Sequence, residues 1–375
     1  MKTVDFLALN KINEPFNEQF VKKVLGILET GQYLFGPHLT EFEKAFSRFC
    51  GVSGSVGVAN GLDALTISLL AWKTQGLVFE GDEVLVPANS FIASALAVIE
   101  SGLKPVFVEP NRLSYTIEAN ECEKHITPKT KVIMPVHLYG SICQMDEICD
   151  LAKTNNILVL EDCAQAHGAK LDGIAAGAWG DAGAFSFYPG KNLGGISDGG
   201  VIVSNDEGFL RKCRAIGNYG AEKKYAHKVA GLNSRMSEIT AAFLEIKLQN
   251  YSIEVKKRRH QAGLYLNHIE DDIFTQKFMR DVGNDIKDRN VFHLFVVEHQ
   301  LRESLIAHLS ENKIESGIHY PMPIYRQEAF INYAPEKRTL SDEICRQVLS
   351  LPIGSHLDDE DIMRVCSVLN SFKFR

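Results

Sequence analysis

The chain has 375 residues, 45% of them apolar and 23% charged, with a formal net charge of −7. This composition fits a globular protein with one large and one smaller domain, and the negative charge argues against a general nucleic-acid binder. No stretch approaches the roughly 20 apolar residues that cross a bilayer, and the eight cysteines show neither a C-x-x-C pair nor metal-ligand spacing. We therefore expect a cytoplasmic protein with free thiols, no metal centre, and no nucleic-acid or membrane partner.

The first predicted elements are a capped helix and a series of buried strands. The segment 58–72, VANGLDALTISLLAW, has the pattern of a helix that begins at Asn60 and Gly61. Four nearly continuous apolar runs follow, separated by segments with a helical pattern. These runs begin near residues 84, 106, 132 and 158, roughly every 25 residues, which is the spacing of βαβ units in a parallel sheet.

The pattern changes in the second half of the chain. The segments 183–189 and 199–206 are separated by a glycine-rich turn too short for a crossover helix, so we expect antiparallel additions to the sheet. A long helical pattern begins near residue 235. Beyond it, 291–299 and 314–321 are predicted to be strands of a second domain.

Together these elements predict an α/β protein with two domains. The large domain is expected over 1–245, with a mostly parallel sheet flanked by helices, and a smaller α+β domain over 246–375. The basic run KKRRH at 256–260 lies within the long helix. We interpret it as a solvated helix face rather than a nucleic-acid patch.

One lysine stands apart from the other charged residues. Lys191 lies in AFSFYPGKNLGG (184–195), beside glycine and without an acidic neighbour within three residues. Such a lysine anchors a phosphate, forms a covalent bond or is merely exposed on a loop. A nucleotide-binding P-loop is excluded, because that motif requires glycine and Ser or Thr where this chain has Phe185 and Asn192.

A carboxylate marks the end of one predicted strand. Asp162 follows four mostly apolar residues in LVLED, at the strand end that faces the ligand crevice of an open α/β sheet. A carboxylate is costly to bury without a cationic partner, and one suitable cation is the protonated pyridine nitrogen of pyridoxal 5′-phosphate (PLP). Gln165 is then close enough in sequence to reach the 3′ oxygen of that ring. The alternative is that Asp162 caps the next helix.

Further residues match the other needs of this cofactor. The backbone N–H groups of Gly61 and Leu62, at the start of the first predicted helix, suit a phosphate, and Ser186 offers a hydroxyl. Phe91, just past a strand end, could stack on the pyridine ring. Taken alone, these are equally the features of a capped helix and a core phenylalanine.

The order of motifs resembles a known family. N-G-x-D-A-L, P-A-x-S-F-I-A, P-V-H-L-Y-G, E-D-x-A-Q-A-H-G, F-S-F-Y-P-G-K-N-L-G and G-x-N-S-R-M occur in that order. They are similar to the DegT/StrS-type nucleotide-sugar aminotransferases, which are fold-type-I PLP enzymes. The resemblance implies that Lys191 is the Schiff-base lysine and that the cofactor-binding residues are Gly61, Leu62, Phe91, Asp162, Gln165, Ser186 and Asn233. Asn233 matches an asparagine that reaches the phosphate of a neighbouring subunit, which implies a homodimer with a shared active site.

The segment 216–236 bears on the substrate. Its N-Y-G followed by a K-Y pair is similar to the branch of the family that acts on dTDP-3-oxo-6-deoxyhexoses. The implied substrate-binding residues are Tyr188, Tyr219, Lys223, Lys224, Tyr225 and His319. The alternatives are a polar surface loop for this segment and a structural role for the histidine.

The function implied by this resemblance is transamination. We expect a dTDP-3-keto-6-deoxyhexose to become a dTDP-3-amino-3,6-dideoxyhexose, galacto or gluco, with L-glutamate as amino donor, for a surface polysaccharide. A C4 aminotransferase of a nucleotide-linked 4-keto sugar is the nearest alternative. A non-catalytic PLP-binding regulator is the alternative of another class.

Overall fold

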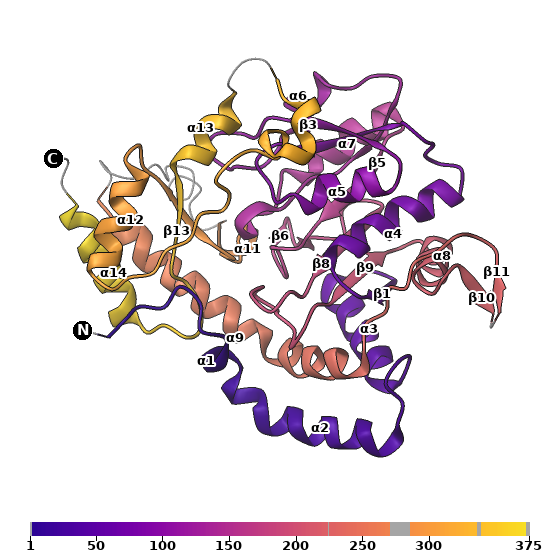
Figure 1. The fold of residues 1–375 in the computed structure, drawn as a ribbon, viewed down its shortest axis with the longest axis horizontal. Coiled ribbons are helices and arrows are strands. Elements are labelled where there is room, and N and C mark those ends of the chain that lie inside the picture. Colours follow the sequence, from indigo (N-terminus) through magenta and orange to yellow (C-terminus); the bar gives the residue numbers. More distant parts are fainter. Residues whose placement is uncertain (1, 224, 271–285, 336–338, 373–375) are drawn as a thin grey trace.

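The computed structural model describes residues 2–223, 225–270, 286–335 and 339–372, and its centre is a seven-stranded sheet (Figure 1). The strand order is β1-β9-β8-β5-β4-β2-β3. Neighbours from β8 to β3 are parallel, whereas β9 is antiparallel to both β8 and β1. The strands are β1 (Gly54–Val58), β2 (Glu83–Pro87), β3 (Lys104–Val108), β4 (Thr130–Ile133), β5 (Leu158–Asp162), β8 (Ala182–Ser186) and β9 (Gly200–Ser204).

The predicted parallel strands are confirmed, with one error of direction. The runs near residues 84, 106, 132 and 158 form β2, β3, β4 and β5. The segment 183–189 was expected to be antiparallel to the sheet, but β8 lies parallel to β5. The 163–181 connection, which carries the short strands β6 (Lys170–Leu171) and β7 (Ile174–Ala175), is long enough for the chain to return to the same edge.

Helices cover both faces of the sheet. Side chains of the strands alternate between two hydrophobic clusters, because successive residues of a strand point to opposite faces. One cluster joins the sheet to α3 (Pro37–Cys50), α7 (Met145–Asn155) and α9 (Glu238–His268). The other joins it to α4 (Gly61–Thr74), α5 (Ala93–Glu100) and α8 (Glu207–Gly217). The strands are therefore buried on both faces, as their continuous apolar sequences predict.

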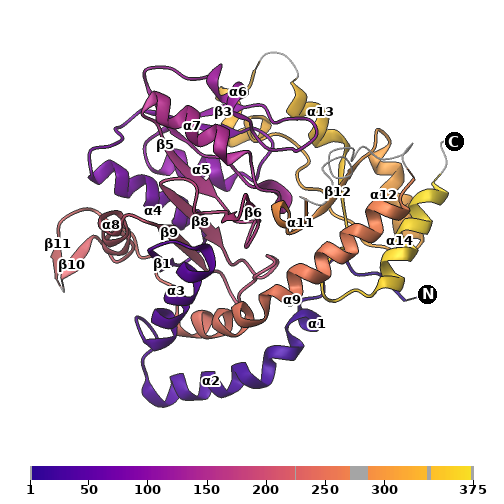
Figure 2. The same cartoon turned by 180° about the vertical axis from the view of Figure 1, so that it is seen from behind.

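The C-terminal part packs around its own core and is joined to the sheet by α9 (Figures 1 and 2). The 31-residue α9 passes through residue 245, so the predicted domain boundary falls inside a helix, and the division at 245/246 stays a proposal. The antiparallel pair β12 (Phe295–Glu298) and β13 (Val348–Leu351) packs with helices of this part. The remaining elements here are α11 (Ile286–Arg289), α12 (Arg302–Glu311), η4 (Ile324–Arg326), η5 (Glu328–Tyr333), α13 (Leu340–Gln347) and α14 (Asp359–Ser371).

Two expectations for this part are wrong. The segment 314–321 is not a strand: it makes only isolated bridges, at Ile314 and at Gly317, and Pro321 cannot donate to a ladder. The basic run 256–260 is not uniformly solvated. Arg258 is 3% exposed, and its guanidinium pairs with Glu254 at 2.6 Å and donates to the backbone carbonyl of Phe292 at 3.1 Å.

The shortest elements complete the fold. The N-terminal segment forms α1 (Leu9–Asn13), η1 (Glu14–Phe16) and α2 (Asn17–Thr30), and α2 packs along α9 (Figures 1 and 2). A small hairpin, β10 (Ala221–Lys223) and β11 (Ala226–His227), projects from the body of the molecule beyond α8 (Figure 1). The sheet connections also contain α6 (Ala119–Glu123) and η2 (Leu138–Gly140). Among the described residues, no helix is long and apolar enough to cross a membrane.

Candidate active site

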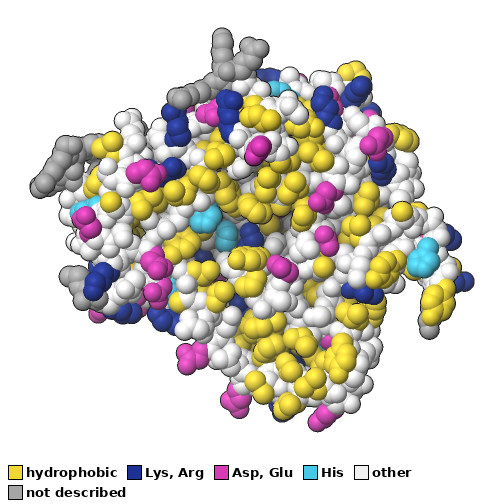
Figure 3. All heavy atoms as spheres, viewed as in Figure 1, with side chains coloured by type: hydrophobic (Ala, Val, Ile, Leu, Met, Phe, Trp, Pro, Cys, Tyr) yellow, Lys and Arg dark blue, Asp and Glu magenta, His cyan; other side chains and the backbone are white. Residues whose placement is uncertain are grey.

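A cavity of about 610 Å³ opens at the carboxyl end of the parallel strands, between the sheet and the C-terminal part. Figure 3 shows a hollow near the centre of this face, with histidine and basic side chains inside it and hydrophobic side chains around it. The structure brings many of the sequence-predicted residues together on its wall. These are Gly61, Leu62, Phe91, Asp162, Gln165, Ser186, Tyr188, Lys191 and His319.

Lys191 lies in the turn that follows β8. The turn is closed by a hydrogen bond from the Lys191 N–H to the carbonyl of Tyr188 (2.8 Å). It requires glycine at 194, because a Cβ there would lie 2.1 Å from the carbonyl oxygen of Pro189. Within the described ranges the Lys191 ammonium has no hydrogen-bond or ion-pair partner. Burial lowers the pKa of Lys191 to about 8, and the negative charge of Asp162 opposes that shift.

Asp162 ends β5 and is 6% exposed. One carboxylate oxygen accepts from the hydroxyl of Ser94 in α5 (2.8 Å), and the other accepts from the N–H of Ala164 (3.1 Å). Residues 163–169 are not helical, so the alternative that Asp162 caps the next helix is wrong. Ser94 was missed by the sequence analysis, although it lies one helical turn beyond Phe91 in PANSFIASA.

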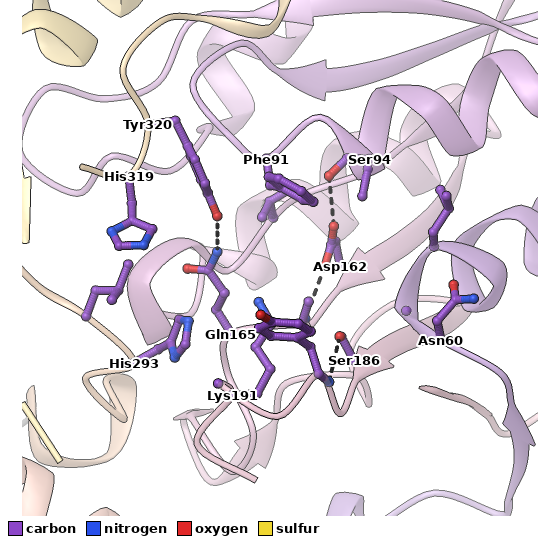
Figure 4. Close-up of a pocket in the computed structure, with 18 of the residues that line it drawn as sticks. Asn60, Phe91, Ser94, Asp162, Gln165, Ser186, Lys191, His293, His319 and Tyr320 are labelled. Carbon is purple, nitrogen blue, oxygen red and sulfur yellow. Dashed lines mark hydrogen bonds between the residues drawn. The ribbon is translucent and has the colours of Figure 1, made fainter. Parts of the chain in front are cut away.

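Gln165 is held by two tyrosines that the sequence analysis missed. Its Oε1 accepts from the backbone N–H of Tyr139 (2.7 Å), and its Nε2 donates to the hydroxyl of Tyr320 (3.2 Å). The Tyr320 ring packs against Phe91, with the centroids 5.5 Å apart (Figure 4). Phe91 is 53% exposed, so it is not a core residue.

The opposite end of the cavity has the features of an anion site (Figure 4). Asn60 caps α4 by accepting from the N–H of Asp63 (2.8 Å), while the N–H groups of Gly61 and Leu62 have no acceptor among the described residues. A Cβ on Gly61 would lie 2.5 Å from Cβ of Ser186 and 3.1 Å from its hydroxyl. Glycine at this position therefore lets the helix terminus and the Ser186 hydroxyl meet, which suits a phosphate.

Two histidines lie beyond Lys191, away from that anion site (Figure 4). His319 pairs with the hydroxyl of Ser350 (2.9 Å), and burial, with a smaller effect of Lys191, lowers its pKa to about 4. His293, which the sequence analysis missed, pairs with Oδ1 of Asn192 (3.0 Å). Burial also lowers the pKa of His293 well below its usual value. Both rings are therefore neutral at physiological pH and available as hydrogen-bonding groups.

Four other predicted residues that the structure describes do not line the cavity of their own chain: Tyr219, Lys223, Tyr225 and Asn233. Asn233 is exposed on the segment that returns from the projecting hairpin. Tyr219, Lys223 and Tyr225 lie on or beside the hairpin itself, and Tyr225 is 85% exposed. Lys224 lies outside the described residues.

Comparison with known proteins decides the family. Residues 15–370 match the DegT/DnrJ/EryC1/StrS aminotransferase family. The chain belongs to this family. The aminotransferase is 41% identical to the dTDP-3-amino-3,6-dideoxy-alpha-D-galactopyranose transaminase of Aneurinibacillus thermoaerophilus, over 99% of this chain and 100% of that protein. It is 38% identical to the dTDP-3-amino-3,4,6-trideoxy-alpha-D-glucose transaminase of Streptomyces venezuelae, over 99% and 97% of the two chains.

A solved structure agrees with this assignment. The crystal structure of Streptomyces venezuelae DesV in complex with a ketimine intermediate superposes with a TM-score of 0.90. It is 37% identical and covers 99% of this chain and 98% of its own. The expected fold class is confirmed, and the protein is a PLP-dependent nucleotide-sugar aminotransferase.

The residues of the cavity fit PLP. They supply an amine (Lys191), a carboxylate with no ion-pair partner among the described residues (Asp162), and N–H groups at Gly61 and Leu62 that have no acceptor there, beside the hydroxyl of Ser186 for the phosphate. Because residue 61 is a glycine, these N–H groups and the Ser186 hydroxyl can lie close together. There is no room at this position for a larger side chain.

Proposed function

We propose that this aminotransferase converts a dTDP-3-keto-6-deoxyhexose into a dTDP-3-amino-3,6-dideoxyhexose, galacto or gluco, with L-glutamate as amino donor. The observation that carries the proposal is the full-length similarity, at 41% identity, to a transaminase named for a dTDP-3-amino-3,6-dideoxyhexose. The cavity supports it, since its volume of about 610 Å³ extends beyond Lys191 to two neutral histidines that can bind sugar hydroxyl groups. We further propose that the product enters a surface polysaccharide.

In the proposed mechanism Lys191 has two successive tasks. Its amine, whose pKa is lowered to about 8, binds the cofactor covalently, since only the unprotonated form is a nucleophile. Once an amino donor has taken the place of Lys191, the freed Nζ would be positioned to move a proton at the carbon that carries the amine. A base positioned in this way contributes about 10²–10⁴-fold in rate.

The other proposed cofactor-binding residues would hold PLP and polarise its ring. Bound PLP supplies an electron sink for the electron pair released when that proton leaves. Asp162 would keep the pyridine nitrogen protonated, Gln165 would donate to the 3′ oxygen, and Phe91 would cover the ring. The N–H groups of Gly61 and Leu62, with the hydroxyl of Ser186, would hold the phosphate.

A homodimer with a shared site is part of the proposal. Asn233, Tyr219, Lys223 and Tyr225 lie outside the cavity of their own chain, on or beside a hairpin that projects into solvent (Figure 1). They can act on a cofactor and a nucleotide sugar if the hairpin reaches the cavity of a second copy. The α2 face adds support, because Val21, Leu25 and Leu28 are each more than half exposed.

The expected compartment is also a proposal. All eight cysteines are free thiols, and seven of them are buried. Free, buried thiols are the usual state in the reducing cytoplasm, which supports a cytoplasmic enzyme.

Two other functions are tested by the same assay. The C4 aminotransferase of a nucleotide-linked 4-keto sugar remains an alternative. A relative of 35% identity from Acidithiobacillus ferrooxidans is named for 3-amination of a UDP-linked sugar, so it bears on the nucleotide rather than on the aminated carbon. A relative of 32% identity from Geobacillus stearothermophilus is named pleiotropic regulatory protein, which keeps a PLP-binding regulator as the alternative of another class.

The first experiment is the visible absorption spectrum of the PLP-loaded protein before and after addition of glutamate, beside Lys191→Ala. We expect a band that glutamate bleaches and that dTDP-3-keto-6-deoxyhexoses restore, with the product's amine position read by NMR. Restoration only by a 4-keto sugar, or only by UDP-linked sugars, would replace the proposed substrate. A band that no amine donor bleaches would favour the regulator.

A further inference from the structure

A closed set of hydrogen bonds surrounds Gln165 on the cavity wall. The backbone N–H of Tyr139 donates to its Oε1 (2.7 Å), its Nε2 donates to the Tyr320 hydroxyl (3.2 Å), and the Tyr139 hydroxyl donates to the carbonyl of His319. Gln165 follows β5, Tyr139 follows β4, and Tyr320 belongs to the C-terminal part. Three distant segments of the chain therefore meet at one amide.

The contact from Tyr139 determines which way this amide points. A backbone N–H can only donate, so the atom that faces it must be the amide oxygen, and Nε2 must face Tyr320 and the cavity. Tyr139 makes this contact with a left-handed backbone (φ 60°), which is uncommon for a bulky residue and is held here by packing, since the side chain is 4% exposed.

The Tyr320 hydroxyl uses one of the two hydrogens on Nε2. The second hydrogen has no acceptor among the described residues, and Gln165 and Tyr320 both line the cavity (Figure 4). Because the first hydrogen is bound to Tyr320, the direction of the second is set by the planar geometry of the amide. The Tyr320 ring is itself held against Phe91, with the centroids 5.5 Å apart.

Ionisation of Tyr320 would not disturb this arrangement at physiological pH. Burial, together with the negative charge of Asp162, raises the pKa of the Tyr320 hydroxyl above its usual value. The hydroxyl therefore stays protonated, and its oxygen stays a neutral acceptor for Nε2.

We propose that Tyr320 is a positioning residue that holds the Gln165 amide so that its second N–H points at the 3′ oxygen of the cofactor. The inference rests on the proposed contact between Gln165 and that oxygen. A donor at this oxygen stabilises its anionic form, so it favours loss of the proton that the lysine-bound cofactor shares between its nitrogen and this oxygen. Tyr320 thus influences the protonation of the cofactor from the C-terminal part, through Gln165.

The test is a pH titration of the visible absorption band in the PLP-loaded protein, which does not depend on turnover. We expect the midpoint to rise by up to about 1 pH unit in Tyr320→Phe, and by at least as much in Gln165→Ala. In the double variant, Tyr320→Phe should add nothing to Gln165→Ala, because the tyrosine acts through the amide. Tyr333→Phe, at a partly exposed tyrosine outside this cavity, is the matched control and should leave the midpoint unchanged.

The outcomes separate the inference from the cofactor assignment. A shift in Gln165→Ala with none in Tyr320→Phe would overturn the role of Tyr320 and leave the proposed cofactor site intact. Shifts that add in the double variant would show that Tyr320 acts directly and overturn the positioning role. If neither variant shifts the midpoint, the Gln165 contact is wrong and the inference fails with it.

A second variant covers the case in which Tyr320→Phe does not fold. Tyr139→Phe keeps the backbone N–H that binds Gln165 but removes the bond to His319, the residue before Tyr320. We expect the midpoint of the titration to rise in Tyr139→Phe as well, but by less than in Tyr320→Phe. An unchanged midpoint in folded Tyr139→Phe would then count against the proposed network.

Discussion

Two neighbouring carboxylates at the end of β5 have opposite environments. Glu161 is fully buried; its Oε2 lies 2.9 Å from Nε2 of His137, and its two oxygens together accept from three backbone N–H groups. These donors belong to Gly177, Trp179 and Gly180. Asp162, one residue later, accepts from two donors among the described residues and lines the cavity.

The difference follows from the strand itself. Successive side chains of a strand point to opposite faces, so Glu161 is directed to the closed face and Asp162 to the face of α5, where the cavity opens. His137, Glu161 and Cys163 lie close enough together to resemble a metal site, but the Glu161 oxygens already have protein partners. Burial and charge therefore do not distinguish the two carboxylates. What distinguishes Asp162, on the cavity side, is that its oxygens can still accept further hydrogen bonds, whereas those of Glu161, on the closed side, already have protein partners.

The largest effect is expected at Lys191, on the cavity side. Lys191→Ala removes the one lysine among the described residues that line the cavity, the group proposed both to bind the cofactor covalently and to move the proton, so we expect turnover to fall by about 10²–10⁴-fold or more. The unfolding transition should change little, because the ammonium has no partner among the described residues. Lys44→Ala, at a lysine that is 58% exposed, is the control and should keep full turnover.

Exchanging one carboxylate at a time tests the comparison directly. Asp162→Asn should reduce kcat/KM by about 10²-fold with little loss of stability, because it removes the charge that the cofactor nitrogen needs. Glu161→Gln should lower the free energy of unfolding by about 3 kcal/mol, because its amide would set an N–H group against backbone N–H donors. Turnover and urea unfolding of both variants are the measurements. A catalytic defect without loss of stability in Glu161→Gln would contradict this division.

The pKa of Lys191 predicts how cofactor uptake depends on pH. With a pKa of about 8, the unprotonated fraction of the amine rises roughly tenfold between pH 7 and 9 and then levels off. Uptake of PLP by cofactor-free protein, followed by absorbance, should show this plateau. Asp162→Asn removes an attraction for the ammonium and should move the curve to lower pH. A rate that still rises steeply above pH 9 would mean that burial does not lower this pKa.

The smallest effect is expected at Ser94. Ser94→Ala removes one donor from Asp162, which should lower the free energy of unfolding by about 1 kcal/mol and weaken PLP binding several-fold. Ser68→Ala is the matched control, because that buried hydroxyl donates to the carbonyl of Ala64 within α4 (2.7 Å). We expect it to affect stability without affecting PLP affinity, as measured by equilibrium titration. Equal losses of affinity in both variants would argue against a specific role for Ser94.

Much of the cavity was predictable because its residues lie at strand ends and helix starts. Lys191, Asp162 and Ser186 each follow or end an apolar run, and the carboxyl ends of parallel strands meet at one edge. Ser94, Tyr139, His293 and Tyr320 could not be found in this way. Each is a single polar residue in a different segment, and it becomes part of the site only through contacts such as that of Tyr320 with a glutamine 155 residues earlier.

The sequence by itself determined the elements whose signal is local. The period of apolar residues, the capped start of α4 and the glycines around Lys191 act over a few positions, and they predicted the parallel strands and the anion site. Only the tertiary structure decided the direction of β8, the absence of a strand over 314–321 and the burial of Arg258. These depend on which distant segment supplies a hydrogen-bond partner or an opposite charge, and such pairings carry no local pattern in the chain.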